Sequence, residues 1–266
     1  MAPEAVIIIP ARYASTRYPG KPLVGLTGAD GTTRTLVERS WRAACAVAGV
    51  DAVYVATDDT RIADVAAGFG ARTVMTDPGC ANGTERCAAA IAQLGIVPRV
   101  VVNLQGDAPL TPDWFVTALI EAVQAGAEIA TPVLRLTPET HARFLEDRRA
   151  DRVGGTTAVM NAAGQALYFS KEVLPYTGRR YGPREQVPAF QHVGVYAYTP
   201  RALLAYLQAG PCLLEELEGL EQLRFLYHGI DVACVEVDAR GRAFWELNNP
   251  EDKPRIEALL KREGIA

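Results

Sequence analysis

The chain has 266 residues with 31 acidic and 27 basic side chains, and 49% of its residues are hydrophobic. These proportions are typical of a globular protein that buries a large core. The net charge of −4 argues against wrapping of duplex nucleic acid, which needs a basic surface. No apolar run reaches the roughly 20 residues that span a bilayer. Residues 1–10 lack the features of a signal peptide, so we expect a cytoplasmic protein without a membrane partner.

Short apolar runs alternate with amphipathic stretches in the first half of the chain. The predicted strands are 5–9, 51–56, 72–75 and 100–104, and the predicted helices are 35–47, 60–68, 84–94 and 112–125. This alternation predicts an α/β fold with a parallel sheet and helices on both faces. Ligands of such sheets bind beyond the carboxyl ends of the strands, so residues that follow a strand are the first site candidates.

The second half of the chain is less regular. The predicted strands are 129–136, 155–160, 165–170, 193–198 and 232–237, the predicted helices are 201–208, 213–227 and 251–262, and 179–187 is a predicted loop. No repeat or long linker separates two domains. We therefore expect a single domain over 1–266, with a dimerisation or lid portion within 129–200.

A cation-rich loop follows the first predicted strand. Its sequence, PARYASTRYPGKPL, carries Arg12, Arg17 and Lys21. These side chains, together with backbone N–H groups, could surround a triphosphate. The loop is neither a Walker loop nor a GxGxxG fingerprint. A solvated basic loop is the alternative interpretation.

An aspartate follows the strand at 100–104, in the sequence NLQGDAPL. Asp107 is placed to hold Mg²⁺ through one carboxylate while substrate phosphates complete the coordination shell. A simple turn residue is the alternative. The segments ATDD and NGTER also follow predicted strands, and the second presents the Thr84 hydroxyl and Arg86 from a helix start. Helix capping is the alternative there.

A series of motifs spreads over nearly the whole chain: PARYASTRYPGKPL, ATDD, NGTER, NLQGD, ALYFSKEVLPY, HVGVYAY and LEQLR. In these motifs and their order the chain resembles the 3-deoxy-manno-octulosonate cytidylyltransferase (CMP-KDO synthetase) family. The resemblance implies a nucleotidyltransferase-like α/β fold, a mixed and mainly parallel sheet flanked by helices, in one cytidylyltransferase domain that forms a homodimer. It also implies an enzyme that uses Mg²⁺ to transfer CMP from CTP to a small anionic acceptor, with release of pyrophosphate.

The resemblance assigns roles to individual residues. The implied catalytic residues are Arg12, Lys21 and Asp107, and the implied metal ligands are Asp107 and Asn248. The implied nucleotide-binding residues are Ala11, Arg12, Ser15, Lys21, Thr84, Arg86 and Gln105. The implied acceptor-binding residues are Arg86, His192, Tyr196, Glu221 and Gln222. For His192 a packing role is the alternative, and for Glu221 it is an exposed surface carboxylate.

Three departures from the family pattern fall where the acceptor and metals are handled. Ala108 follows the aspartate where the family has glutamate, Thr157 stands in place of a lysine, and Asn248 replaces the aspartate of GVDTPEDL. Asparagine adds no negative charge, so we expect weaker two-metal binding. Fewer carboxylates suit a more anionic acceptor. The sequence therefore predicts a phosphonate such as phosphonoformate, and with it a role in phosphonate biosynthesis.

Three alternatives stay open at this point. The acceptor could be 3-deoxy-manno-octulosonate (KDO) or a related 2-keto sugar acid. The chain could be a non-catalytic CTP-binding protein, because losses of acidic residues often accompany lost turnover. It could also be a sugar-phosphate uridylyl- or guanylyltransferase, since base choice depends on loop contacts.

Overall fold

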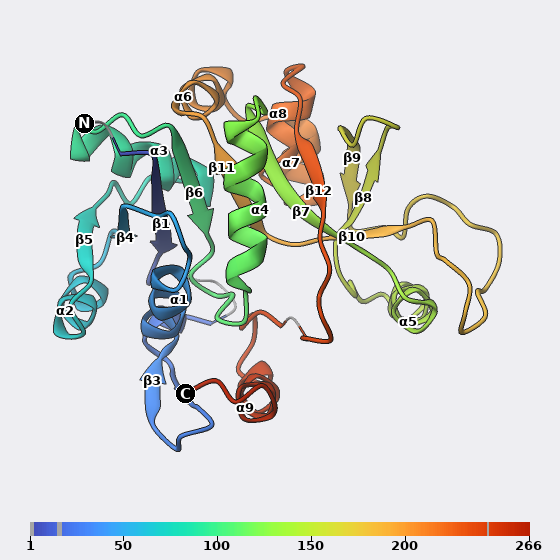
Figure 1. Cartoon of the computed structure of the whole chain (residues 1–266), viewed down its shortest axis with the longest axis horizontal. Helices are drawn as coiled ribbons and strands as arrows, with labels where there is room; N and C mark the ends of the chain where they lie inside the picture. Colours follow the sequence, from blue (N-terminus) through green and yellow to red (C-terminus); the bar gives the residue numbers. More distant parts are fainter. Residues whose placement is uncertain (1–2, 15–17, 244) are drawn as a thin grey trace.

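The structure is a computed structural model that describes residues 3–14, 18–243 and 245–266 (Figure 1). The strands are β1 (Ala5–Ala11), β2 (Gly25–Thr27), β3 (Thr33–Thr35), β4 (Ala52–Thr57), β5 (Arg72–Met75), β6 (Val100–Leu104), β7 (Ile129–Arg135), β8 (Thr157–Met160), β9 (Ala166–Ser170), β10 (Phe190–His192), β11 (Val195–Tyr198) and β12 (Ala233–Glu236). The helices are α1 (Leu36–Cys45), α2 (Thr60–Gly68), α3 (Gly83–Leu94), α4 (Asp113–Gln124), α5 (Pro138–Arg149), α6 (Pro200–Ala209), α7 (Leu213–Glu218), α8 (Leu223–Tyr227) and α9 (Asp252–Arg262), with a 3₁₀ turn η1 at Lys21–Leu23.

One mixed sheet of ten strands runs through the described residues, in the order β5-β4-β1-β6-β11-β7-β10-β8-β9, with β12 paired to β7. The first four strands of this order are parallel, and β11, β10 and β9 run against the others. The strands β2 and β3 form a separate hairpin. The α/β fold with a mixed, mainly parallel sheet flanked by helices is therefore confirmed.

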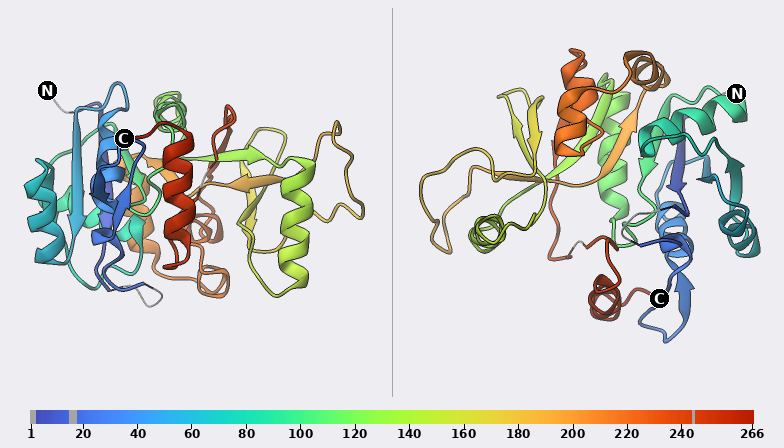
Figure 2. Two further views of the ribbon diagram at one scale, coloured as in Figure 1. Left: turned by 90° about the horizontal axis from the view of Figure 1, so that it is seen from below. Right: turned by 180° about the vertical axis from the view of Figure 1, so that it is seen from behind.

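The first strand shows why the sheet needs helices on both faces. Ile7 and Ile9 pack in a core cluster with residues of α1, α2 and α4. Val6 and Ile8 pack in a second cluster with residues of α3, α6 and α8. Successive side chains of a strand point to opposite faces, so this uninterrupted apolar run is buried only when both faces are covered. The two helical layers can be followed in Figure 2.

Several chain segments meet at one edge of the sheet. Both β1 and β6 point toward the end of the molecule where α9 lies (Figure 1). The antiparallel β11 starts where β6 ends, with Val195 paired to Leu104 and Tyr196 to Asn103. On α9, Ile256 and Leu260 pack in a cluster that includes Leu247. Loops after β1 and β6, the start of β11 and the segment before α9 thus share this edge.

Most predicted elements occur close to their expected bounds, but some differ for physical reasons. The predicted helix over 213–227 is two helices, because Gly219 takes a left-handed conformation (φ 61°) that ends α7. Helix α5 was not predicted from the sequence. Its buried residues are only His141 and Phe144, so this helix lacks a long apolar stripe. The short strands β2, β3 and β10 were not predicted either.

The structure also bears on disulfides and on membranes. All five cysteines are free thiols. In the described part of the chain, no helix combines the length and apolar character needed to cross a membrane.

Gly106 lets the loop after β6 pass against the end of β1. A Cβ atom on Gly106 would lie 2.8 Å from the Pro10 carbonyl oxygen, and the Ser40 hydroxyl donates to the Gly106 carbonyl at 3.0 Å. The contact is with backbone, which cannot rotate away as a side chain would. We expect Gly106→Ala to lower the free energy of unfolding by about 1–3 kcal/mol.

Urea unfolding of this variant checks the expectation, and Gly68→Ala is its control. Gly68 is the last residue of α2 and a Cβ there meets nothing within 4 Å, so the control should be neutral or slightly stabilising. Equal stability of the two variants would show that the close approach at Gly106 carries no constraint.

Candidate active site

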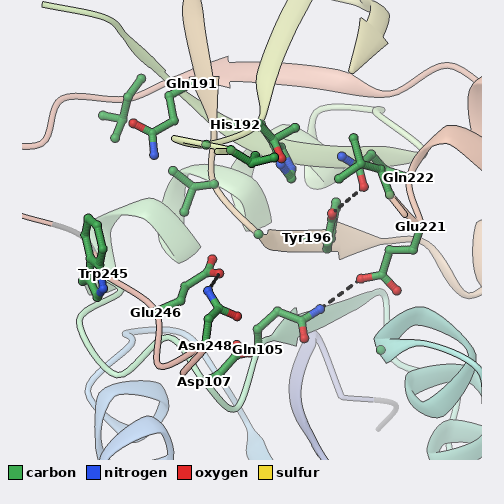
Figure 3. A pocket seen from close by; sticks show the side chains of 18 of the residues that line it. Gln105, Asp107, Gln191, His192, Tyr196, Glu221, Gln222, Trp245, Glu246 and Asn248 are labelled. Carbon is green, nitrogen blue, oxygen red and sulfur yellow. Dashed lines mark hydrogen bonds between the residues drawn. The ribbon is translucent and has the colours of Figure 1, made fainter. Parts of the chain in front are cut away.

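A large pocket of about 2090 Å³ opens at this edge of the sheet (Figure 3). Most of the predicted site residues line it: Ala11, Arg12, Lys21, Arg86, Gln105, Asp107, His192, Tyr196, Glu221, Gln222 and Asn248. Ser15 and Arg17 lie outside the described residues. The structure therefore brings residues from both halves of the chain to one cavity.

Lys21 and Asp107 meet inside the pocket. Gly20 adopts a left-handed conformation (φ 71°) before the turn η1, which begins at Lys21. The Lys21 ammonium lies 2.6 Å from the Asp107 carboxylate, and the two side chains are 15% and 25% exposed. The loop after β1 and the loop after β6 thus place opposite charges at one point that solvent still reaches.

Thr84 does not line the pocket, in contrast to its expected nucleotide contact. Its side chain is fully buried, and its hydroxyl lies 2.8 Å from the Tyr198 hydroxyl. Its backbone N–H donates to Glu221 Oε2 at 2.8 Å. The cap of α3 is Asn82, whose side chain accepts from the Glu85 N–H. Thr84 therefore contacts Glu221 and lies behind the pocket wall.

Arg86 joins two of the sequence motifs. Its guanidinium donates to Thr76 Oγ1 at 2.6 Å and to Asp58 Oδ2 at 3.2 Å, so NGTER and ATDD are linked directly. The Arg86 side chain is almost fully buried but still contributes to the pocket wall. These contacts hold the guanidinium in place at the pocket.

Glu221 is a partly buried carboxylate that orients Gln105. The Gln105 amide donates from Nε2 to Glu221 Oε1 at 3.0 Å (Figure 3). A Cβ on Gly83 would come within 2.7 Å of the same Nε2 atom, so this arrangement requires glycine there. Burial raises the pKa of Glu221 above its usual value. The alternative of an exposed surface carboxylate is therefore wrong.

His192, Tyr196 and Gln222 form the part of the pocket beyond Gln105. His192 ends β10, and its Nε2 atom lies 2.9 Å from Thr131 Oγ1. Burial lowers the pKa of His192 to about 3, so the ring is neutral at physiological pH. The Tyr196 hydroxyl donates to Gln222 Oε1 at 3.0 Å.

The segment before α9 carries a carboxylate that the sequence analysis overlooked. The Leu247 N–H donates to the Asp107 carbonyl at 3.0 Å, which holds this segment against the loop after β6. The Asn248 amide donates to Glu246 Oε2 at 3.3 Å (Figure 3). The replacement of aspartate by Asn248 stands, but Glu246 places a carboxylate directly beside it. The available signal was a glutamate two residues before Asn248.

Arg224, the last residue of LEQLR, was also missed. Its guanidinium is 2% exposed and donates to Glu215 at 2.7 Å and to Glu85 at 2.9 Å. It also lies 4.0 Å from the centre of the Tyr206 ring. A buried arginine is satisfied only by such a set of partners. This network ties the start of α3 to α7 and α8, and so it fixes the region around Glu221.

The pocket offers oxygen ligands suited to Mg²⁺. Among the described residues, no group of three or more His, Cys, Asp or Glu side chains is arranged to hold a metal. Magnesium in nucleotide sites commonly needs only one or two carboxylates, because substrate phosphates supply further oxygens. Asp107, Glu246 and Asn248 line the pocket with two carboxylates and one amide, and the Leu247 N–H bond to Asp107 holds their segments together, so the residues present fit such an ion.

Comparisons with known proteins agree along the whole chain. The cytidylyltransferase family profile matches residues 6–232. The 3-deoxy-manno-octulosonate cytidylyltransferase of Maricaulis maris (strain MCS10) is 45% identical over 263 residues, 98% of each protein. The mitochondrial enzyme of that name from Arabidopsis thaliana is 34% identical, over 99% of this chain and 85% of that protein. The structure of CMP:2-keto-3-deoxy-manno-octonic acid synthetase complexed with CTP matches with a TM-score of 0.82 at 31% identity, covering 98% of this chain and 99% of that one.

The raised pKa of Glu221 gives a prediction about stability. An acid whose pKa is raised by folding ionises at lower pH in the unfolded chain, so it costs stability once the pH exceeds its usual pKa. Glu221→Gln removes this cost, and its NH2 group can donate to Gln105 once the Gln105 amide turns its oxygen toward it, while the new carbonyl oxygen still accepts from Thr84. We expect a higher free energy of unfolding at pH 7, with the gain vanishing below about pH 4.

Glu215→Gln is the matched control. Glu215 is also buried, but it is paired with Arg224, so its loss leaves a buried cation without that partner. We expect this variant to lose about 3 kcal/mol of stability. Denaturant unfolding at several pH values measures both effects, and a destabilised Glu221→Gln protein at pH 7 would contradict the first.

Proposed function

The chain belongs to the 3-deoxy-manno-octulosonate cytidylyltransferase family, and we propose that it transfers CMP from CTP to KDO with release of pyrophosphate. Cytidylyltransferases are nucleotidyltransferase enzymes, and the matching structure is a complex with CTP. Relatives named for the KDO reaction match this chain over nearly its full length. The predicted phosphonate acceptor has no support among these relatives.

The observation that carries the choice of acceptor is the chemistry of the pocket around His192. The His192 ring is neutral, and Tyr196 and Gln222 are also uncharged. The nearby Glu221 side chain is acidic. Hydroxyl groups of a sugar acid can donate to such groups. A fully ionised phosphonate brings two or three negative charges and has no hydrogen to donate. This half of the pocket therefore favours a polyhydroxylated acceptor.

Glu246 counts against a phosphonate acceptor. A phosphonate was predicted because Asn248 leaves the segment before α9 with fewer carboxylates than in the family. Glu246 places a carboxylate beside Asn248 and keeps negative charge at this point of the wall. A more anionic acceptor would be repelled there.

The charged residues at the other side suit the triphosphate. We expect Arg12 and Lys21 to bind the phosphates and to stabilise the negative charge that develops on the departing pyrophosphate. Asp107 would hold Mg²⁺ together with Glu246 and Asn248, and the ion would neutralise phosphate charge and align the groups. The resemblance assigned Gln105 to the nucleotide, but it is held by Glu221, an implied acceptor residue, and we therefore expect it to contact the acceptor instead. In-line displacement at the α-phosphorus requires such alignment more than covalent chemistry.

Two predictions from the sequence concern parts of the molecule beyond the site. A homodimer is proposed by analogy with the family. The segment 129–200 is proposed as its dimerisation or lid portion, and it exposes the large apolar side chains Val153, Leu167 and Tyr176. Such side chains are common at contacts between subunits.

Acceptor identity is tested by pyrophosphate release from CTP and Mg²⁺ with KDO or phosphonoformate. We expect turnover with KDO and none with phosphonoformate. Turnover with phosphonoformate alone would overturn the proposal in favour of the phosphonate. CTP binding without turnover on a panel of sugar acids and phosphonates would indicate a non-catalytic CTP-binding protein. Replacing CTP by UTP or GTP tests the remaining alternative.

The role of Asp107 gives a separate prediction. Asp107→Asn keeps the shape of the side chain but removes the charge that would hold Mg²⁺. We expect kcat/KM to fall by about 10²-fold or more, with weaker Mg²⁺ binding measured by calorimetry in the presence of CTP.

Asp113→Asn is the control for the Asp107 variant, because Asp113 lies in the first turn of α4 and is exposed. It should leave kcat/KM and Mg²⁺ binding unchanged. An Asp107→Asn enzyme as active as the Asp113→Asn enzyme would disprove the assignment.

A further inference from the structure

The hydrogen bonds around Thr131 determine which nitrogen of His192 carries the proton. Thr131 is fully buried on β7. Its Oγ1 atom lies 2.8 Å from the Val195 carbonyl oxygen and 2.9 Å from His192 Nε2. Thr131 Oγ1 also lies 3.4 Å from the Val193 carbonyl oxygen. Carbonyl oxygens only accept, so the arrangement that satisfies the nearer one directs the single hydroxyl hydrogen of Thr131 to Val195. Thr131 Oγ1 must then accept from His192, and the ring hydrogen is on Nε2.

The other ring nitrogen is consequently an acceptor. Burial lowers the pKa of His192 to about 3, so the ring holds one hydrogen and Nδ1 keeps its lone pair. Within the described ranges, Nδ1 has no hydrogen-bond partner, and His192 lines the pocket. The ring is held between Phe169 and Tyr196, with centroid distances of 5.1 and 5.5 Å. It therefore presents a fixed acceptor.

Gln222 supplies the complementary group on the other side of Tyr196. Its Oε1 atom accepts from the Tyr196 hydroxyl, and its Nε2 atom is buried without a hydrogen-bond partner in the described chain. A buried amide donor left unpaired costs free energy, which a ligand oxygen would recover. Hydroxyl groups both donate and accept, so a polyhydroxylated ligand can satisfy His192 and Gln222 together.

We propose that Thr131 is a positioning residue that fixes His192 as the Nε2–H tautomer, so that Nδ1 accepts a hydrogen bond from a hydroxyl group of the acceptor substrate. The inference deepens the proposed function and rests on it for the identity of the substrate. Carboxylate and phosphonate oxygens carry no hydrogen, so Nδ1 would face them lone pair to lone pair. Thr131 thereby contributes to acceptor selectivity although it does not line the pocket.

The test has two measurements: the tautomer of His192 in the ligand-free protein, and the steady-state kinetics of the enzyme. Nitrogen-15 spectra of the histidine rings report which nitrogen is protonated, and comparison with His192→Gln identifies the signal among the three histidines. We expect the Nε2–H form in the wild-type protein. In Thr131→Val this form should lose its dominance, and KM for KDO should rise about tenfold or more. KM for CTP should stay unchanged.

Two variants complete the comparison. Thr131→Ser keeps the hydroxyl and should retain the wild-type tautomer and KM for KDO. Thr117→Val removes a threonine hydroxyl on α4 that donates to the Asp113 carbonyl, outside the pocket. It should change neither readout.

A protonated Nδ1 in the wild-type protein would overturn the inference even if Thr131→Val did not fold. A Thr131→Val enzyme with the wild-type tautomer and unchanged KM for KDO would also overturn it. Absence of KDO turnover in the wild-type enzyme would refute the proposed function instead. The tautomer spectra would then still decide whether Thr131 controls the ring.

Discussion

The site depends on the close parallel pairing of β1 with β6 and on the backbone contact that follows it. Ile8 pairs with Asn103, and the two chains stay close beyond the strands, where Gly106 passes against Pro10. This contact brings the loop that carries Lys21 to the loop that carries Asp107. The ammonium and the carboxylate then lie 2.6 Å apart although they are far apart in sequence. The sheet edge therefore places both charges at one point of the pocket.

A second, buried set of charges supports the acceptor side. Arg224 holds Glu85 and Glu215, and thereby joins α3 to α7 and α8. Glu221 lies in the same region but forms no ion pair within the described residues, and burial raises its pKa. Glu85 and Glu215 therefore stabilise the fold through Arg224. Glu221 lowers the stability of the fold and orients Gln105. Active sites commonly keep such groups because function needs them where stability does not.

The sequence was sufficient for the parts of the fold and site that depend on local pattern. The apolar run of β1 predicted a strand covered on both faces, and residues after β1 and β6 predicted the pocket. The sequence was insufficient where tertiary contacts determine the position of a side chain. Thr84 follows a strand and resembles a ligand residue, yet its hydroxyl pairs with Tyr198 from a distant strand. Glu246 has no periodic or motif signal, and only packing of the segment before α9 brings it beside Asn248. The polar helix α5 has too few buried positions to show a helical pattern.

Acceptor selectivity in this pocket is a question of hydrogen-bond polarity as well as charge. The Gln105 amide donates one of its two Nε2 hydrogens to Glu221, and this orientation leaves its carbonyl oxygen for a ligand. In the proposed tautomer, His192 Nε2–H donates to Thr131 and Nδ1 keeps a lone pair for the ligand. The Gln222 carbonyl oxygen accepts from the Tyr196 hydroxyl, and its Nε2 group remains a donor without a partner in the described chain. In each case the hydrogen bond to a protein partner determines whether a donor or an acceptor remains for the ligand. A site that pairs hydroxyl groups rejects ligands without them, because its polar atoms would stay unpaired. A deprotonated phosphonate can accept from Gln222, but it has no hydrogen to donate to the Gln105 carbonyl oxygen or to the His192 lone pair. A substitution of valine for Thr131 would remove one of these constraints while keeping the size of the side chain, so under the proposed function part of the specificity for the acceptor would lie in a residue that does not line the pocket.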